Sequence, residues 1–342
     1  MLRAMELDEL AQRLVPFVRA MTGDANAVVS SVHKMPGHAG FAYGFDAVHG
    51  GRRESFFLRL PPPNVAWQGT ADVLRQVQAL RALDGTDVPH CPVLWASDEL
   101  AWFGRPYFVV PKLEGDVLRL GPGEWAAKLP AETLREMAHQ AMRALAGIHR
   151  VSWQERAPGL GPAIPAHDDV ARWDRFLQKL AEPERFALQP RVRERLLARL
   201  PADAPVGIFH GDFQVGNLFY AFDGRLLAVI DWELVGIGAT LNDVGWIATF
   251  NDPAAWPSLG RGPGPGDAAF PGADELVALY AEAWGAKLPD LAWYRALAAY
   301  KFAVISGFNL ALHRRGKRHD PLWEEIAKSI EPLLARAAEL VG

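Results

Sequence analysis

Residues 30–60 alternate between apolar and polar positions with a period of two, which is typical of β-strands. The turn His49-Gly50-Gly51 lies between two of these runs and predicts a hairpin. We predict strands before Met35 and over 41–48, 55–60, 88–95 and 105–113.

A period of three to four residues is found in two early segments and in most of the chain beyond residue 130, and it predicts helices. Pro16 lies inside the first helical run, where a kink or break is expected. Thr70 is the expected N-cap of the second. We predict helices over 6–20, 70–83, 130–150, 166–180, 192–200, 274–284, 291–312 and 321–341.

Apolar runs and three polar side chains lie close together in the stretch 206–231, VGIFHGDFQVGNLFYAFDGRLLAVID. Its apolar runs flank the turn Asp223-Gly224 and predict a hairpin. The hairpin would bring Asp212, Asn217 and Asp231 towards one point. Carboxylate and amide oxygens are ligands that Mg²⁺ prefers, together with water and substrate phosphates. Turn capping by the two aspartates is the alternative use of these residues.

The motifs HGDFQVGN (210–217) and IDWE (230–233) resemble those of the aminoglycoside phosphotransferase family, the kinase-like enzymes that phosphorylate small molecules. The resemblance implies that Asp212 is the catalytic base and that His210 supports its loop. It also implies that Asn217 and Asp231 hold Mg²⁺ with ATP or GTP. Asp243 matches the family aspartate that braces the catalytic loop.

The resemblance also implies that residues of the N-terminal part of the chain bind phosphate, but two of these residues differ from the family pattern. Arg59 stands where kinases carry a strand lysine, and a guanidinium binds phosphate in a different geometry. A solvent-exposed arginine on an edge strand is the alternative. Kinase-like enzymes pair this cation with a helix glutamate, but the expected position is Gln76. An amide could still accept a hydrogen bond from Arg59, without the strength of two charges.

Two further nucleotide contacts are expected from position along the chain. Gly37 and Gly40 lie in a loop between strands, which is either a phosphate-binding loop or an ordinary hairpin loop. The backbone near Val110 and Lys112 would pair with the adenine or guanine base, because Pro111 has no N–H.

Composition narrows the class of protein. The 342 residues carry a net charge of −4, which gives no basic footprint for nucleic acid. Cys91 is the only cysteine, so no intramolecular disulfide can form. Neither a signal peptide nor an uninterrupted apolar run of membrane-spanning length is found. A cytoplasmic enzyme, monomeric or homodimeric and without a membrane partner, is therefore expected.

Together these features predict an α+β, two-lobe protein-kinase-like fold. Residues 1–111 would form an antiparallel sheet plus helix that binds nucleotide, and residues 112–342 a mainly helical catalytic lobe. The expected reaction is Mg²⁺-dependent transfer of a γ-phosphoryl group to a small-molecule hydroxyl. The Pro/Gly-rich stretch 251–272 is either an insertion or part of the acceptor site.

Two other functions stay open. A non-catalytic, kinase-like nucleotide-binding protein is suggested by Arg59 and Gln76. A metal-dependent phosphohydrolase could use His210, Asp212 and Asp231. The acceptor itself is not defined by the fold, although the twelve tryptophans favour an apolar acceptor over a polycationic one.

Overall fold

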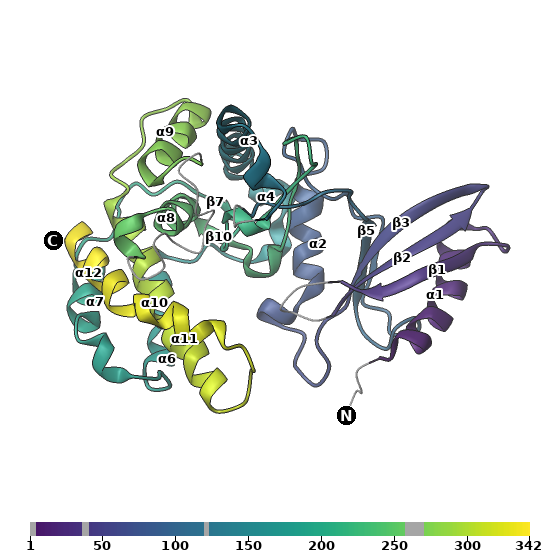
Figure 1. Ribbon diagram of the computed structural model, residues 1–342, viewed down its shortest axis with the longest axis horizontal. Coiled ribbons are helices and arrows are strands. Elements are labelled where there is room, and N and C mark those ends of the chain that lie inside the picture. The colour runs from purple at the N-terminus through teal and green to yellow at the C-terminus, as the bar shows by residue number, and fades with distance from the viewer. Residues whose placement is uncertain (1–4, 36–40, 120–122, 257–269) are drawn as a thin grey trace. The chain divides into compact units, whose positions relative to one another are not determined.

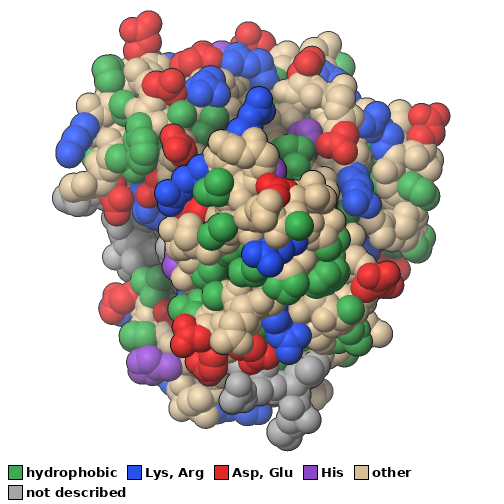
Figure 2. All heavy atoms as spheres, turned by 90° about the vertical axis from the view of Figure 1, so that its right-hand side faces the viewer, with side chains coloured by type: hydrophobic (Ala, Val, Ile, Leu, Met, Phe, Trp, Pro, Cys, Tyr) green, Lys and Arg blue, Asp and Glu red, His purple; other side chains and the backbone are tan. Residues whose placement is uncertain are grey.

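The computed structural model describes residues 5–35, 41–119, 123–256 and 270–342 (Figure 1). The chain divides into two compact units. Unit 1 consists of Met1–Glu114, Trp153–Leu160 and Ile230–Val235. Unit 2 consists of Gly115–Ser152, Gly161–Val229 and Gly236–Gly342. Lys/Arg and Asp/Glu side chains are interspersed over the face drawn in Figure 2, in keeping with the small net charge.

Unit 1 is built on a five-stranded antiparallel sheet in the order β1-β2-β3-β5-β4, most of which can be followed in Figure 1. Its strands are β1 (Val28–Lys34), β2 (Ala42–His49), β3 (Arg52–Arg59), β4 (Trp95–Ser97) and β5 (Tyr107–Pro111). The unit's α-helices are α1 (Leu7–Thr22), α2 (Val73–Ala82) and α4 (Trp153–Arg156). Gly50 and Gly51, with φ of +53° and +74°, form the β2–β3 turn in a backbone conformation that favours glycine.

The core of unit 1 lies between α1 and the sheet. Phe17 is fully buried, and its ring packs edge-on against four aromatic rings: Trp95, Trp102, Phe103 and Tyr107. The expected break at Pro16 is wrong, because α1 continues through it to Thr22. Burial of the apolar face of α1 offsets the one backbone hydrogen bond that the proline removes.

Two other boundaries differ from the expectation. Asp72, rather than Thr70, caps α2, and its carboxylate accepts hydrogen bonds from the amides of Leu74 and Arg75. The strand predicted over 88–95 is confined to Trp95–Ser97. Pro89 and Pro92 precede it, and proline cannot donate to a strand ladder.

Unit 2 is mainly helical. Its longer helices are α3 (Ala131–His149), α7 (Gln189–Ala198), α8 (Leu241–Phe250), α9 (Ala273–Trp284), α10 (Ala292–Arg314) and α12 (Ile330–Leu340). The helices predicted over 166–180 and 321–341 are each interrupted, giving α5 (Ala166–Ala171) with α6 (Asp174–Leu177) and α11 (Leu322–Ile326) with α12.

Helix α10 forms the centre of unit 2 and packs against α8 and α12. It is the one described helix whose length and composition would suit a membrane span, but 78% of its apolar window is buried inside the protein. A buried core helix accounts for this pattern.

Five short strands complete unit 2: β6 (Asp116–Val117), β7 (Val206–Phe209), β8 (Leu218–Tyr220), β9 (Leu226–Val229) and β10 (Gly236–Ala239). The predicted hairpin is confirmed as β8–β9, with Leu218 opposite Val229. Strand β7 pairs with β10. These two small ladders carry the sequence motifs.

Candidate active site

A sharp turn at the end of β7 carries His210-Gly211-Asp212. Phe209, the last residue of β7, pairs with Gly236 of β10. Gly211 follows with φ of +88°, a left-handed conformation that glycine adopts without steric cost. The turn therefore ends the strand and leaves Asp212 beyond the ladder.

A buried carboxylate holds this turn in place. Asp243, near the start of α8, is 1% exposed. Its side chain accepts hydrogen bonds from the backbone amides of His210 (2.6 Å) and Gly211 (2.9 Å), and His149 Nε2 lies 3.2 Å from it. A buried carboxylate is costly unless donors surround it, so Asp243 and the turn stabilise each other.

His149 extends this network away from the turn. With Nε2 donating to Asp243, its Nδ1 accepts the hydrogen bond from the Tyr280 hydroxyl at 2.8 Å. Burial raises the pKa of Tyr280 above its ordinary value, so the hydroxyl remains a donor. His149 is thus a structural histidine.

Both oxygens of the Asp212 carboxylate have a fixed donor. The Trp246 indole N–H donates to Oδ1 at 2.8 Å, and the Asn217 side-chain amide donates to Oδ2 at 2.9 Å. The same Asn217 nitrogen donates to the Asp212 carbonyl at 2.8 Å. Each carboxylate oxygen accepts more than one hydrogen bond, so a half-buried Asp212 held in this way can still receive a hydroxyl proton.

His210 supports Asp212 through the backbone. Its ring is fully buried, and its Nδ1 accepts a hydrogen bond from the Asp212 amide at 3.3 Å. The ring also packs edge-on against Phe213. These contacts stabilise the loop beside the carboxylate.

Asn217 is suited to hold a cation through its carbonyl oxygen. Both side-chain hydrogen bonds recorded for it use the amide nitrogen. Asn217 immediately precedes β8, whose Leu218 pairs with Val229. The chain therefore leaves β9 beside Asn217 and reaches Asp231 two residues later.

Asp231 adopts a left-handed backbone conformation, with φ of +62°, at the start of the short helix η6 (Trp232–Leu234) in unit 1. Such a conformation is uncommon outside glycine and is often found at functional sites. The described residues contain no group of three or more His, Cys, Asp or Glu side chains arranged for a metal. Asn217 of unit 2 and Asp231 of unit 1 each carry an oxygen of the kind that Mg²⁺ prefers.

Arg59, at the end of β3, has a counter-ion that the sequence analysis did not identify. Its Nη2 lies 3.3 Å from Glu233 Oε2, and the two side chains are 15% and 32% exposed. Glu233 belongs to the IDWE motif, two residues after Asp231. The lack of a glutamate on the second predicted helix was the signal that could have directed attention to it.

The expected hydrogen bond between Gln76 and Arg59 is not observed. It is 5% exposed, and its Nε2 has no hydrogen-bond partner among the described residues. The neighbouring Arg75 instead donates from Nε to the Val235 carbonyl at 3.0 Å. Helix α2 is thereby tied to the segment that follows Glu233.

Two of the other residues predicted to contact the nucleotide are Val110 and Lys112. Val110 lies opposite Phe57 in the sheet. The Lys112 amide donates to the Ser55 carbonyl at 2.9 Å, so a nucleotide base at Lys112 would use its carbonyl oxygen. Gly37 and Gly40 lie outside the described residues.

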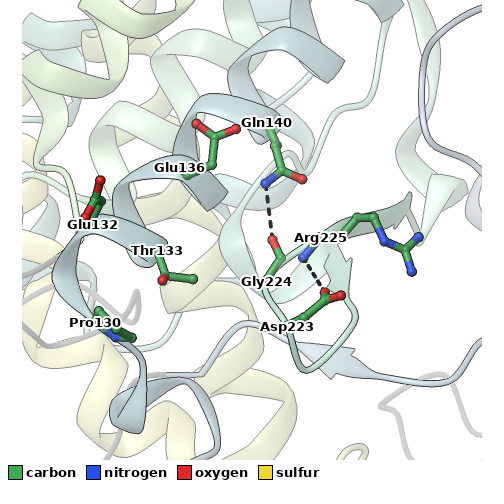
Figure 3. A pocket seen from close by; sticks show the side chains of 8 residues that line it. All are labelled: Pro130, Glu132, Thr133, Glu136, Gln140, Asp223, Gly224 and Arg225. Carbon is green, nitrogen blue, oxygen red and sulfur yellow. Dashed lines mark hydrogen bonds between the residues drawn. The ribbon is translucent and has the colours of Figure 1, made fainter.

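One cavity of about 470 Å³ in unit 2 does not contain the motif residues. It lies between the start of α3 and the β8–β9 turn (Figure 3). Gln140 Nε2 donates to the Gly224 carbonyl at 3.2 Å on its wall. This turn is at the opposite end of the hairpin from Asn217, so the cavity is distinct from the catalytic loop.

Comparison with known proteins places the chain in a family. A sequence profile described as "Phosphotransferase enzyme family" matches residues 44–297. Acyl-CoA dehydrogenase family member 11 of Gallus gallus is 28% identical over 306 residues, which cover 84% of this chain and 38% of that protein. The Homo sapiens protein of the same name is 28% identical over 266 residues, covering 74% of this chain and 33% of that protein. The chain thus spans about a third of the length of these relatives.

Solved structures share the fold. A provisionally assigned aminoglycoside phosphotransferase of Ralstonia eutropha superposes with a TM-score of 0.76 at 21% identity, covering 96% of this chain and 97% of that one. A microcompartment-associated aminopropanol kinase gives 0.58 at 19% identity, covering 98% and 96%. The APH(4)-Ia ternary complex with ADP and hygromycin B gives 0.59 at 16% identity, covering 96% and 97%. The predicted two-lobe, kinase-like α+β fold is therefore confirmed.

We expect Asp243→Asn to lower the free energy of unfolding by about 3 kcal/mol, because the new amide group would face buried donors. Urea unfolding followed by fluorescence measures this. Asp274→Asn is the control, since that carboxylate is 91% exposed and pairs with Arg295; its loss should cost about 1 kcal/mol or less. Equal losses in both variants would contradict the role given to Asp243.

Proposed function

The chain belongs to the phosphotransferase enzyme family, and from this premise we propose that it transfers the γ-phosphoryl group of ATP or GTP to a small-molecule hydroxyl. Asp212 is the proposed catalytic base. The observation that carries the proposal is the carboxylate of Asp212, held on both oxygens by Trp246 and Asn217.

The proposed reaction begins with a hydroxyl that donates its hydrogen bond to Asp212. As the hydroxyl oxygen bonds to the γ-phosphorus, its proton passes to the carboxylate. The bond between the γ-phosphorus and the bridging oxygen breaks, and the nucleoside diphosphate leaves. Fixed orientation is the main contribution of Asp212, since phosphoryl transfer depends chiefly on positioning and charge stabilisation.

Asn217 and Asp231 would hold Mg²⁺, which would supply neutralising charge to the phosphates when bound. Arg59 would bind phosphate oxygens through its guanidinium, and Glu233 would keep that group oriented. Val110, Lys112 and the loop with Gly37 and Gly40 are proposed to complete the nucleotide site.

For the acceptor we favour a hydroxylated acyl thioester over an aminoglycoside. Curated relatives that match most of this chain carry the name acyl-CoA dehydrogenase family member 11. Trp246 packs against Phe250 and Phe302, and Trp256 packs against the same two phenylalanines. These four rings are buried, so the interior behind the proposed base is apolar, which suits an apolar acyl chain better than a polycation.

Nucleotide binding should raise the melting temperature in the presence of Mg²⁺. A ligand at 100 times its dissociation constant stabilises the native state by about 2.7 kcal/mol. We expect Asp231→Asn to lose the Mg²⁺-dependent part of this shift. Asp168→Asn, an exposed carboxylate, is the control and should retain it. No shift with either ATP or GTP in the unaltered protein would contradict the proposal.

Removing the charge of Glu233 should weaken nucleotide binding. In Glu233→Gln the Arg59 guanidinium loses its ion pair, so ordering it on the phosphates becomes less favourable, and KM for the nucleotide should rise about tenfold. Glu275→Gln removes the exposed ion pair with Arg135 and should leave KM unchanged. A lower KM in Glu233→Gln would mean that Glu233 competes with the phosphates for Arg59.

Asp212→Asn should lower phosphoryl transfer by roughly 10²–10⁴-fold while the nucleotide-induced thermal shift persists. Trp246→Phe keeps an aromatic ring but removes one donor to Asp212, so a smaller loss is expected. Transfer is measured from γ-labelled nucleotide to a panel of alcohols. Full activity in Asp212→Asn would exclude it as the base, and phosphate-ester hydrolysis without nucleotide would favour a phosphohydrolase.

A further inference from the structure

A buried charged cluster in unit 2 has no place in the reaction described so far. Its centre is Asp169 of α5, which is 4% exposed. Asp169 Oδ2 accepts hydrogen bonds from Lys301 of α10 (3.0 Å) and Asn242 of α8 (2.7 Å), and Arg172 Nη2 lies 2.6 Å from Oδ1. Three helical segments thus meet at one carboxylate. We name this set of residues the Asp169 cluster.

The Asp169 cluster carries an excess of positive charge. Burial alone would raise the pKa of Asp169, but Lys301 and Arg172 hold it below its ordinary value, so the carboxylate stays ionised. The carboxylate thus contacts two basic side chains, Lys301 and Arg172. Burial lowers the pKa of Lys301, and the charges of Asp169 and Asp243 oppose this effect. Arg172 is the outer of the two basic side chains, because its side chain is 36% exposed whereas that of Lys301 is 10% exposed. The charge left over is therefore that of a partly accessible guanidinium.

Several polar atoms of the cluster have no hydrogen-bond partner within the described part of the chain. They are the acceptors Asp169 Oδ1 and Asn242 Oδ1 and the donor Arg172 Nε, together with Nε1 of the adjacent Trp173, all buried. Of these, Asp169 Oδ1 has the ion pair with Arg172. Leaving such an atom unpaired costs about 1–3 kcal/mol, and unpaired groups gathered in one place call for a functional explanation. The Trp173 ring lies beneath the Arg172 guanidinium, 5.5 Å from centroid to Cζ, which orients it further.

The cluster lies close to the proposed base along α8. Asn242 and Trp246 are four residues apart, so they share one helix face about one turn apart. Asn242 donates to Asp169, and Trp246 donates to Asp212. Lys301 precedes Phe302, whose ring packs on Trp246 at 5.6 Å. The base and the cluster are thus connected through neighbouring side chains of α8 and α10.

We propose that the Asp169 cluster is an acceptor subsite that binds an oxyanion of the substrate, with Arg172 as the contacting residue. The inference rests on the proposed phosphotransferase function and specifies its substrate class as a hydroxylated anion. Asp169 orients the guanidinium, and Lys301 offsets the charge of Asp169. A cationic acceptor would be repelled by the excess charge.

Four hydroxyl compounds test the charge preference, three of them small and of similar size and the fourth a coenzyme A thioester. They are 3-hydroxybutyrate, 3-hydroxybutyryl coenzyme A, neutral butane-1,3-diol and cationic 1-aminopropan-2-ol. We expect one of the anionic pair to have a kcat/KM at least about tenfold above the neutral and cationic compounds, the usual scale for one charge-assisted hydrogen bond. Preference for the free acid would identify a carboxylate as the oxyanion, and preference for the thioester would identify a coenzyme phosphate.

Arg172→Gln should remove this preference by raising KM for the anionic acceptor while KM for the nucleotide stays the same. Arg172→Lys keeps the charge and should retain part of the preference for the anionic acceptor. Arg175→Gln is the matched control, since Arg175 is exposed and also lies over an aromatic ring, that of Phe176. Preference for a neutral or cationic acceptor, or a preference unchanged in Arg172→Gln, would overturn the proposal.

Calorimetry separates failure of this inference from failure of the proposed function. The four compounds are titrated into the protein loaded with Mg²⁺ and a non-hydrolysable ATP analogue. A protein that shows no nucleotide-induced thermal shift would refute the phosphotransferase function itself. A protein that binds nucleotide but neither anionic compound would refute the oxyanion subsite alone.

Discussion

The buried carboxylate of Asp243 is the constraint on which the catalytic loop depends. Two successive backbone amides, from His210 and Gly211, point to this one side chain. Amides at such a turn cannot join a strand ladder, and buried donors must be satisfied. Gly211 supplies the backbone conformation, and Asp243 supplies the acceptor that makes the conformation stable. The position of Asp212 follows from that pair.

Helix α8 links the loop to its surroundings. Asp243 fixes the backbone of the turn, Trp246 fixes one oxygen of Asp212, and Asn242 reaches the Asp169 cluster. Because all three side chains project from one rigid helix, their spacing is set by helical geometry rather than by loop conformation. The packing of α8 against α10, the longest described helix of the unit, keeps that spacing constant.

Local patterns predicted most of the elements, because periodicity reflects which face of a segment is buried. The helix α3, the hairpin β8–β9 and the three strands up to Arg59 were all expected from such patterns. The wrong predictions concern positions where a contact with a neighbouring group determines the local structure. Pro16 is tolerated because the apolar face of α1 is buried, and Asp72 caps α2 because its carboxylate meets the free amides.

Contacts between residues far apart in the sequence were the part of the site that could not be predicted. The HGD and IDWE motifs identified Asp212 and Asp231, yet neither motif indicates Trp246 as a donor to Asp212. Arg59 and Glu233 are 174 positions apart, and no periodicity relates them. Such pairs depend on how elements pack, which a single sequence does not display.

The Arg59–Glu233 ion pair also links the proposed phosphate-binding residue to the segment that carries Asp231. In the kinase plan the strand cation depends on a helix that can move independently of the metal-binding aspartate. Here its counter-ion lies two residues after Asp231, on a segment to which α2 is tied through Arg75 and the Val235 carbonyl. A shift of that segment would displace Asp231 and Glu233 together. Under the proposed function, phosphate binding by Arg59 and metal binding by Asp231 would therefore be gained or lost as one event, and the uncharged Gln76 on α2 is compatible with this arrangement.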